Sequence, residues 1–554
     1  MVKRTFRFLP AIIGCIAVVI AVKPLLVAGI TSGHDVGSHL VRVQRFYEAL
    51  RQGQFPVRWI EGVLPAMGHP HFEFYPPFFY YLTSLVQLLG LDFVSATKAV
   101  IIASAAIGFG AMYLLAQTYF ASAAGIAAAV LFTFSPYRLS QLYVRAAYGE
   151  YLATALAPLA FVWINRPIPL ALALTAIALT HQPAFLILVP ALASWMAITW
   201  IKSRDTKGFL KSLTGLGLFL GLIAFFILPA MAERKFIHWT NLTRDYYNFR
   251  QHFAGAIQLV YSKWDYGISV AGRADTMSFQ LGVVNWLMVM AALVLLYLKR
   301  IPKLFALYSL LFTLLGLFMA TPLSTPAWER FSILAFIQYP WRFLLLSTFT
   351  TSLLAGIVAS SLLKKFQKST QMVIIVLFSI ITMITNLNYI KPSTYLPKTI
   401  FDLNSPQRAQ PKDPMSGLEP GYLPVFVREI SPDRPQGAAG LVSGDAAIRT
   451  TVDNIIEKRV SIEAKTDIVM RFFVHYFPGW QAKLGDTSPR LLAINPDNPE
   501  GFIDVAVPKG NHTVNLRFTR TPARDLGDFI SLVTLVILLV LLIKPKVSKP
   551  KLSQ

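Results

Sequence analysis

The sequence predicts a polytopic α-helical membrane protein with about twelve transmembrane helices and a C-terminal extracytoplasmic antiparallel β-sandwich domain. The chain has 554 residues, of which 55% are apolar and only 14% are charged, a balance unlike that of soluble domains. Apolar runs long enough to cross the roughly 30 Å hydrocarbon layer occur again and again. After Lys391 the composition becomes polar and proline-rich, and further on apolar and polar residues alternate.

The first apolar run resembles the hydrophobic core of a signal peptide, because it follows the basic segment Met1 to Arg7. No small-residue cleavage site follows it, so we expect an uncleaved first helix. The predicted spans are apolar runs with polar or basic boundaries, at 8–30, 95–117, 121–136, 151–165, 167–180, 183–201, 210–231, 280–298, 303–321, 341–361, 371–390 and 527–543.

The net charge of +23 is concentrated in short loops and tails. The segments predicted to lie inside carry eighteen Lys and Arg residues and one acid, Asp205. Such an excess sets orientation in a membrane and does not indicate nucleic-acid binding, so no nucleic-acid partner is expected. The pattern predicts a multi-pass protein of the cytoplasmic (inner) membrane, with both termini cytoplasmic and the lipid bilayer as its surroundings.

Three regions follow from this topology. Residues 1–390 form a transmembrane domain with outer loops at 31–94 and 232–279, residues 391–526 an extracytoplasmic β-rich domain, and residues 527–554 the last helix and a basic cytoplasmic tail. The apolar piece Pro77 to Leu89 is too short to span comfortably, so we expect a helix along the outer interface; a short tilted span is the alternative.

The β-rich region shows strand patterns such as Arg459 to Ala464 and Phe502 to Val507, separated by turn signals. Together they predict an antiparallel sandwich of roughly 90 residues that starts near Gly437. An irregular lead-in covers 391–436. The single cysteine, Cys15, lies in the first predicted helix, so an intrachain disulfide cannot stabilise this domain.

The first outer loop is the most chemically promising segment. His34, Asp35, His39 and Arg42 follow the first span closely. A carboxylate beside histidine and arginine can act as a general base or hold a metal or phosphate partner. Alternatively, Asp35 only caps an amphipathic helix from about Gly37, because aspartate is a favoured N-cap residue.

The predicted topology brings further polar residues to the same face. Glu150 supplies a second carboxylate, and arginines can stabilise the charge of a departing phosphate; these arginines are Arg138, Arg145 and Arg342. The alternative for each arginine is anchoring at the membrane interface. His181 is predicted to bind substrate or, alternatively, to form an interhelical hydrogen bond. A zinc site of His34, His39, His69 and His71 has weak support, since loop histidines alone do not fix a geometry.

Several motifs resemble bacterial membrane proteins of the 6-pyruvoyl-tetrahydropterin synthase-related, YfhO-like family. In order, they are His34-Asp35 with His39, Gly53 to Trp59, Phe74 to Tyr81, Ser135 to Arg138, Arg145 to Glu150, Thr180-His181, Gln338 to Phe343, Tyr476 to Trp480 and Val507 to His512. That family is in turn similar in layout to the GT-C glycosyltransferases, which have an acidic residue in the first outer loop.

This resemblance implies a glycosyltransferase that uses a polyprenyl-phosphate sugar donor at the outer face, with Asp35 and Glu150 as catalytic residues. His34, His39, Arg42, Arg138, Arg145, His181 and Arg342 would bind substrate. The paired acids usual in GT-C enzymes are absent around Asp35, which leaves the cofactor open, a divalent cation included. The competing functions are a transporter or flippase of a lipid-linked cell-envelope intermediate and a non-catalytic scaffold that displays the β-domain.

Overall fold

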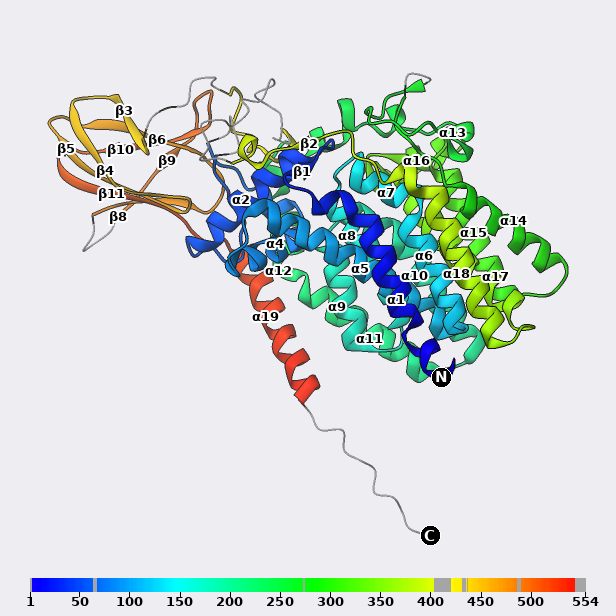
Figure 1. Cartoon of the computed structure of the whole chain (residues 1–554). Helices are drawn as coiled ribbons and strands as arrows, with labels where there is room; N and C mark the ends of the chain where they lie inside the picture. Colours follow the sequence, from blue (N-terminus) through cyan, green and yellow to red (C-terminus); the bar gives the residue numbers. More distant parts are fainter. Residues whose placement is uncertain are drawn as a thin grey trace, which may run out of the picture.

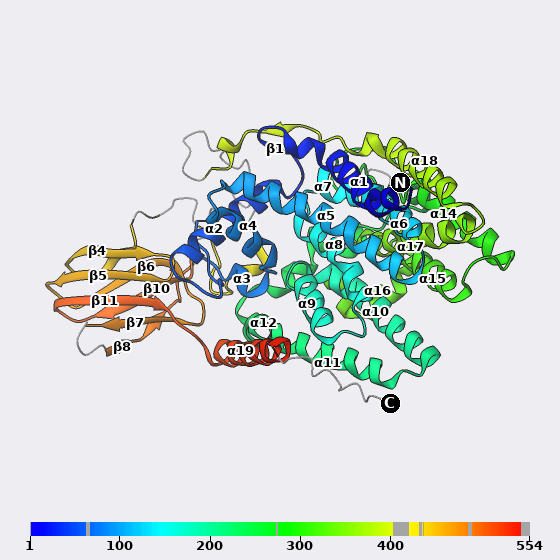
Figure 2. The same cartoon turned by 60° about the horizontal axis from the view of Figure 1, so that its bottom comes forward.

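The computed structural model consists of a large helical bundle with a β-domain at one end, as Figures 1 and 2 show from two directions. It describes residues 2–62, 67–272, 275–402, 420–430, 435, 437–485 and 490–543. The basic tail beyond Ile543 and much of the predicted lead-in 391–436 lie outside the described residues.

The long helices fall where apolar runs were expected. They are α1 (Val2–Val22), α5 (Phe93–Tyr119), α10 (Gln182–Ser203), α11 (Thr206–Leu222), α15 (Lys303–Met319), α17 (Leu344–Leu363), α18 (Lys368–Asn386) and α19 (Pro522–Ile543). Shorter helices lie between them, namely α6 (Ser122–Phe134), α7 (Pro136–Tyr143), α8 (Tyr148–Val162), α9 (Pro167–Ala178), α12 (Ala224–Glu233) and α14 (Val283–Tyr297).

By length and composition, six helices within the described residues can cross a membrane, or eight if each of two bent pairs is one span. The protein is therefore a multi-pass membrane protein. One bent pair is α11 with α12 and the following residues to Phe236, at 57°. The helices α6, α8, α9 and α14 are only 12 to 15 residues long. The predicted count of about twelve requires all four to span, and it stays a prediction.

The first helix is shorter than predicted. It ends at Val22, and the 3₁₀ turn η1 (Lys23–Leu26) follows, so the apolar span runs from Phe8 to Leu26 and not to residue 30. Pro24 lacks a backbone N–H and so cannot continue the helical hydrogen bonds. The chain then forms the short strand β1 (Ile30–Thr31), which pairs with β2 (Tyr395–Leu396).

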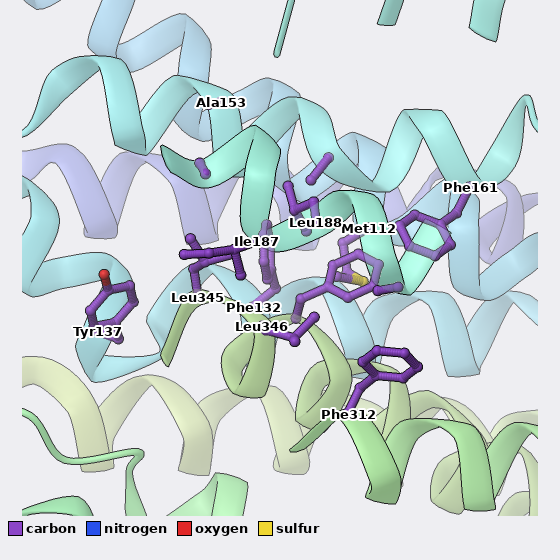
Figure 3. Close-up of a cluster of buried hydrophobic side chains, with 14 of the residues drawn as sticks. Met112, Phe132, Tyr137, Ala153, Phe161, Ile187, Leu188, Phe312, Leu345 and Leu346 are labelled. Carbon is purple, nitrogen blue, oxygen red and sulfur yellow. The ribbon is translucent and has the colours of Figure 1, made fainter. Parts of the chain in front are cut away.

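The core of the bundle is continuous and apolar. Figure 3 shows part of it, where Met112, Phe132, Ile187 and Leu345 from four helices pack together. Tyr137 lies at one end of the labelled group, and its hydroxyl belongs to the polar cluster described below. The apolar packing thus holds the helices that carry the polar groups.

The C-terminal domain is an antiparallel β-sandwich, as predicted. One sheet has the order β3-β6-β10-β9 and the other β4-β5-β11-β7-β8. The strands are β3 (Ala439–Ser443), β4 (Ala446–Asn454), β5 (Glu457–Ala464), β6 (Ile468–His475), β7 (Trp480–Leu484), β8 (Arg490–Leu492), β9 (Ile494–Asn495), β10 (Phe502–Val507) and β11 (Gly510–Phe518). Val460 and Leu516 of one sheet and Met470 and Val505 of the other are buried, because inward residues alternate along each strand.

The segment between α2 (Val36–Arg51) and α4 (Phe78–Leu88) joins the β-domain to the bundle. It includes the short helix α3 (His71–Phe74). Trp59 is fully buried and meets the Trp480 ring edge-on at 5.5 Å. Arg58 and Glu73 form a buried ion pair at 3.0 Å, and Glu73 also lies 3.6 Å from Arg524 at the start of α19. Apolar contacts and buried charges together anchor the domain.

The two ends of the helical bundle differ. Figure 1 shows the N-terminal end of α1 and the C-terminal end of α19 on the same lower side, whereas β1, β2 and the loops around α13 (Ala256–Val260) lie on the upper side. The helix α4 lies beside α2, between the bundle and the β-domain in both views. Its position relative to the bilayer stays a prediction.

Candidate functional site

A cavity of about 710 Å³ lies between the bundle and the upper loops. Its walls come from the start of α2, the α3–α4 connection, α8, the start of α10, α12 and the loops around Tyr246 and Tyr339. Asp35 and Glu150 both line it, although they are 115 positions apart in the sequence. The fold thus brings the two predicted carboxylates to one cavity.

A tight backbone junction places Asp35 beside the turn between α7 and α8. The backbone N–H groups of His34 and Asp35 donate to the carbonyls of Val144 and Arg145, at 3.1 and 2.9 Å. A Cβ atom on Gly33 would come within 2.7 Å of the Ala146 side chain, so only glycine permits this approach. Ala146 itself has a φ of +53°, which is a strained conformation for alanine.

The carboxylate of Asp35 is half-buried and accepts no hydrogen bond from any side chain within the described residues. Asp35 occupies the N-cap position of α2, yet its side chain makes no capping hydrogen bond. The capping interpretation of Asp35 therefore has no support in this conformation. An accessible carboxylate without a partner can accept a proton from a bound hydroxyl group.

Glu150 is in the opposite situation, because it is fully buried and both of its carboxylate oxygens accept hydrogen bonds. Tyr137 and Gln141 donate to Oε1 at 2.6 and 2.9 Å, and Arg145 donates to Oε2 at 2.7 Å. The Nε of Arg342 lies 3.5 Å from the same Oε2. This carboxylate is arranged to hold two arginines in place.

The pairing around Glu150 leaves an excess of positive charge. Arg145 and Arg342 share one carboxylate, both are nearly buried, and both line the cavity. Buried charge that is not balanced by the protein favours an anionic ligand, and guanidinium groups match the geometry of phosphate oxygens. The cavity therefore offers an anion-binding position next to Glu150.

Aromatic rings support the two arginines. The guanidinium carbon of Arg145 lies 4.4 Å from the centre of the Trp341 ring, and that of Arg342 lies 4.6 Å from the centre of the Tyr339 ring. Both aromatic residues belong to the sequence segment Gln338 to Phe343. Their role depends on which ring meets which arginine in space, and no local sequence signal shows that.

Histidines occupy different positions around the cavity. His181 is the N-cap of α10, where its Nδ1 accepts from the Ala184 N–H at 3.1 Å, and its Nε2 lies 3.9 Å from Glu150. His39 lies on the buried face of α2 and bonds to the Tyr80 hydroxyl at 2.8 Å. Burial, with the charge of Arg42 next in size, lowers the pKa of His39 to about 3, so this side chain is neutral. His34 is exposed at the cavity edge, 3.0 Å from the carbonyl oxygen of Tyr266.

Two further arginines were predicted to bind substrate. Arg42 lines the cavity with its guanidinium over the Tyr75 ring. Arg138 does not line it. It is turned into the helix packing, where it donates to the Thr154 hydroxyl at 2.8 Å and lies over the rings of Phe132 and Tyr151. The α-helical geometry of α7 directs Arg138 away from the face that carries Tyr137 and Gln141 toward Glu150.

The four loop histidines do not form one group. His69 and His71 are buried beside each other near the β-domain, where the backbone and ring of His475 bond to Met67 and Gly68, whereas His34 and His39 lie at the cavity. Within the part of the chain that the structure describes, no three His, Cys, Asp or Glu side chains come together to hold a metal ion. The zinc alternative thus has no ligand set among those residues.

The rest of the cavity lining falls into an apolar group and an aromatic group. Phe185 and Leu186 of α10 and Phe226 and Ile227 of α12 form the apolar group. Met231 of α12 also lines the cavity and is 58% exposed, so this apolar wall reaches the outer surface of the bundle. The aromatic group comes from the upper loops and consists of Trp239, Tyr246, Tyr247, Phe336 and Tyr422.

No family model and no curated protein matches the sequence. Among solved structures, the chain is similar to the arabinofuranosyltransferase AftD from Mycobacteria, with a TM-score of 0.43 and 14% identity over 69% of this chain and 26% of that one. It is also similar to ArnT from Cupriavidus metallidurans bound to undecaprenyl phosphate, with a TM-score of 0.28 and 14% identity over 63% and 77% of the two chains. The chain thus spans about a quarter of the length of AftD, and at these TM-scores individual residues cannot be related.

Proposed function

We propose that the chain is a membrane glycosyltransferase that moves a sugar from a polyprenyl-phosphate-linked donor to an acceptor at the outer face of the cytoplasmic membrane. The observation that carries the proposal is the composition of one cavity. It joins Asp35, whose carboxylate accepts no side-chain hydrogen bond among the described residues, two arginines that share the carboxylate of Glu150, and an apolar wall that reaches the bundle surface.

The donor fits the two contrasting walls. Its phosphate lies against Arg145 and Arg342, and its isoprenoid chain lies along the apolar residues of α10 and α12. The surface position of Met231 lets such a chain enter from the bilayer without crossing water. A free nucleotide-sugar would have no use for that apolar wall.

The reaction balances with this chain's own side chains. Asp35 takes the proton of the acceptor hydroxyl, whose oxygen forms a bond to the anomeric carbon of the sugar. The bond from that carbon to the phosphate oxygen breaks, and its electron pair stays on the phosphate. Arg145 and Arg342 stabilise the charge that grows there.

Glu150 takes a different role from the one predicted. Its carboxylate is fully buried, accepts three hydrogen bonds and lies 3.5 Å from Nε of Arg342, so it is poorly placed to take a proton from substrate. We propose it as a positioning residue that holds the arginine pair. Asp35 remains the proposed base.

The proposed orientation follows from charge and from the fold together. The basic loops favour cytoplasmic termini, and the N-terminal end of α1 and the C-terminal end of α19 lie on the side opposite the upper loops. Twelve spans, the domain limits 1–390, 391–526 and 527–554, and kinship with YfhO-like proteins belong to the same proposal. A scaffold that only displays the β-domain would not require a buried arginine pair at an apolar cavity.

Transfer from radiolabelled polyprenyl-phosphate sugars in liposomes that contain the purified protein tests this function. We expect label to move to an acceptor saccharide or lipid only when the protein is present. Failure of every donor to bind or react, in protein with a wild-type unfolding transition, would contradict the proposal.

A further inference from the structure

Trp341 and Tyr339 stack on each other beside the arginine pair. Their rings are nearly parallel, at 11°, with centres 5.0 Å apart. The guanidinium carbon of Arg145 lies over the Trp341 ring, and that of Arg342 lies over the Tyr339 ring. The same two arginines also meet at Glu150, so each guanidinium group has both an aromatic and an anionic partner.

The indole N–H at the edge of the Trp341 ring contacts a buried group of polar side chains. The indole N–H of Trp341 donates to the Ser269 hydroxyl oxygen at 3.1 Å. The same oxygen lies 3.0 Å from Nδ1 of His252 and 3.3 Å from Oδ2 of Asp275. All three residues that meet at this point are buried, with exposures of 0% for His252, 2% for Ser269 and 8% for Asp275.

The hydrogens in this group can be counted. A serine hydroxyl donates one hydrogen bond and accepts two. Trp341 occupies one accepting position, so of the contacts to His252 and Asp275 one must be a donation by Ser269 and the other an acceptance. In addition, Nε2 of His252 lies 2.5 Å from the carbonyl oxygen of Tyr246. A carbonyl only accepts, so Nε2 carries a hydrogen.

Two arrangements satisfy all of these contacts. If Ser269 donates to an ionised Asp275, Nδ1 of His252 must carry a second hydrogen and the ring is cationic. If Ser269 donates to Nδ1, Asp275 must be protonated and donate to Ser269. Both arrangements contain one proton more than neutral His252 with ionised Asp275, so the complete network holds one shared proton.

The surroundings favour the second arrangement. Burial raises the pKa of Asp275 to about 6, against the opposing effect of the hydrogen bond that its carboxyl group accepts from the Met277 N–H. Burial also lowers the pKa of His252, and the charge of Arg342 acts in the same direction. The other titratable groups at His252 are Tyr246 and Tyr339, whose rings meet it edge-on. The proton therefore resides on Asp275 and leaves as the pH rises through about 6.

We propose that Trp341 and Ser269 are positioning residues, and that the proton shared by Asp275 and His252 through Ser269 sets how tightly Arg145 and Arg342 bind an anionic group. The inference rests on the proposed function for the identity of that group, a lipid phosphate. When the proton is lost, Ser269 donates to the carboxylate, and the lone pairs of Nδ1 and the hydroxyl oxygen face each other. This repulsion displaces the Ser269 hydroxyl that accepts from the Trp341 indole N–H, so Trp341 and the arginine that it contacts are less well ordered.

The test uses the full chain in liposomes and measures polyprenyl phosphate binding from about pH 5 to about pH 8. The Asp275→Asn variant keeps an oxygen toward the Met277 N–H and offers a permanent N–H donor to Ser269, so it imitates the protonated state. We expect wild type and variant to bind equally at the acidic end. Above about pH 6 the variant should bind tighter by about fivefold or more, a typical coupling between sites. Comparison at equal pH cancels the ionisation of the phosphate itself.

Trp341 provides matched controls. Trp341→Phe keeps a ring in contact with Arg145 and Tyr339 but has no N–H, so it should bind phosphate with the pH dependence of the Asp275→Asn variant. Trp341→Leu removes the ring and should weaken binding at every pH. Wild-type pH dependence in Trp341→Phe, or equal pH dependence in wild type and Asp275→Asn, would overturn the inference.

A second readout does not depend on the ligand. The pKa of Asp275 in the folded protein is raised from 3.8 to about 6, so the folded state loses stability as pH rises across that interval. The difference between the Tm of Asp275→Asn and the Tm of wild type should therefore shift in favour of the variant as the pH rises from about 4 to about 6.5. A constant Tm difference would refute the shared proton even if lipid phosphate binds. Absence of phosphate binding at every pH, with the Tm trend present, would instead count against the proposed function.

Discussion

Glu150→Gln removes a negative charge from a fully buried position while it keeps the volume of the side chain. In the wild type, Oε2 of Glu150 lies 2.7 Å from Arg145 and 3.5 Å from Arg342. The variant leaves both guanidinium groups buried without a counter-charge. Loss of one partner of a buried ion pair costs about 3–5 kcal/mol, and we expect a loss of unfolding free energy in that range.

Unfolding titrations of the purified protein in mixed micelles measure this loss. Asp35→Asn is the matched control, since it also removes one carboxylate charge from the same cavity but leaves no buried partner behind. It should unfold with the wild-type free energy. The double variant Glu150→Gln/Arg145→Gln should recover part of the loss, because it removes one of the two uncompensated charges.

The result that would refute this reasoning is wild-type stability of Glu150→Gln. A double variant that is less stable than the single one would also contradict it, because the two arginines would then not depend on Glu150. Loss of transfer with unchanged stability would return Glu150 to a direct catalytic role.

Three further predictions concern other parts of the chain. Ile227→Trp narrows the apolar wall of the cavity, so it should raise KM for long-chain donors and leave KM for a short-chain analogue unchanged; an equal rise for both would place the lipid elsewhere. Burial lowers the pKa of His475 from 6.5 to about 4, so the unfolding free energy should fall by up to roughly 3 kcal/mol as the pH falls from about 6.5 to about 4. In His475→Gln, the unfolding free energy measured by urea titration should fall less over the same pH interval. In a Cys15→Ala background, Ser443→Cys should react with an impermeant maleimide from the outer side only, and labelling from the cytoplasmic side would reverse the proposed orientation.

Much of the fold could be predicted because its signals are local. The long apolar run Phe93–Tyr119 predicts a helix, and the alternating run Glu457–Ala464 predicts a strand, from the pattern within each segment alone. Bends were harder to predict. The break at Ile223, which turns α12 by 57° and makes it a cavity wall, lies inside an apolar run without a nearby proline or charge.

The candidate site could be predicted only in part. Asp35, Arg145, Glu150 and Arg342 were singled out by residue type and predicted side of the membrane, and all four line one cavity. Their partners could not be foreseen, because a hydrogen bond between residues such as Trp341 and Ser269 depends on tertiary packing. Arg138 was also singled out by residue type, but it does not line the cavity.

Residue type alone also could not separate the roles of the two carboxylates. Asp35 and Glu150 are both acids near a predicted helix start, yet one carboxylate lacks a side-chain donor among the described residues and the other has four groups around it. The difference arises from burial. Half-buried Asp35, without a side-chain donor among the described residues, is therefore the better placed of the two to take a proton.

The most direct test of the central claim is sugar transfer by purified Asp35→Asn beside wild type, in liposomes that contain a radiolabelled polyprenyl-phosphate sugar. Asparagine keeps the volume of the side chain but cannot act as a base. Loss of a general base typically lowers a rate by about 10² to 10⁴, and we expect a loss of this size with wild-type thermal stability and unchanged binding of polyprenyl phosphate. Transfer at near wild-type rate by Asp35→Asn would contradict the account.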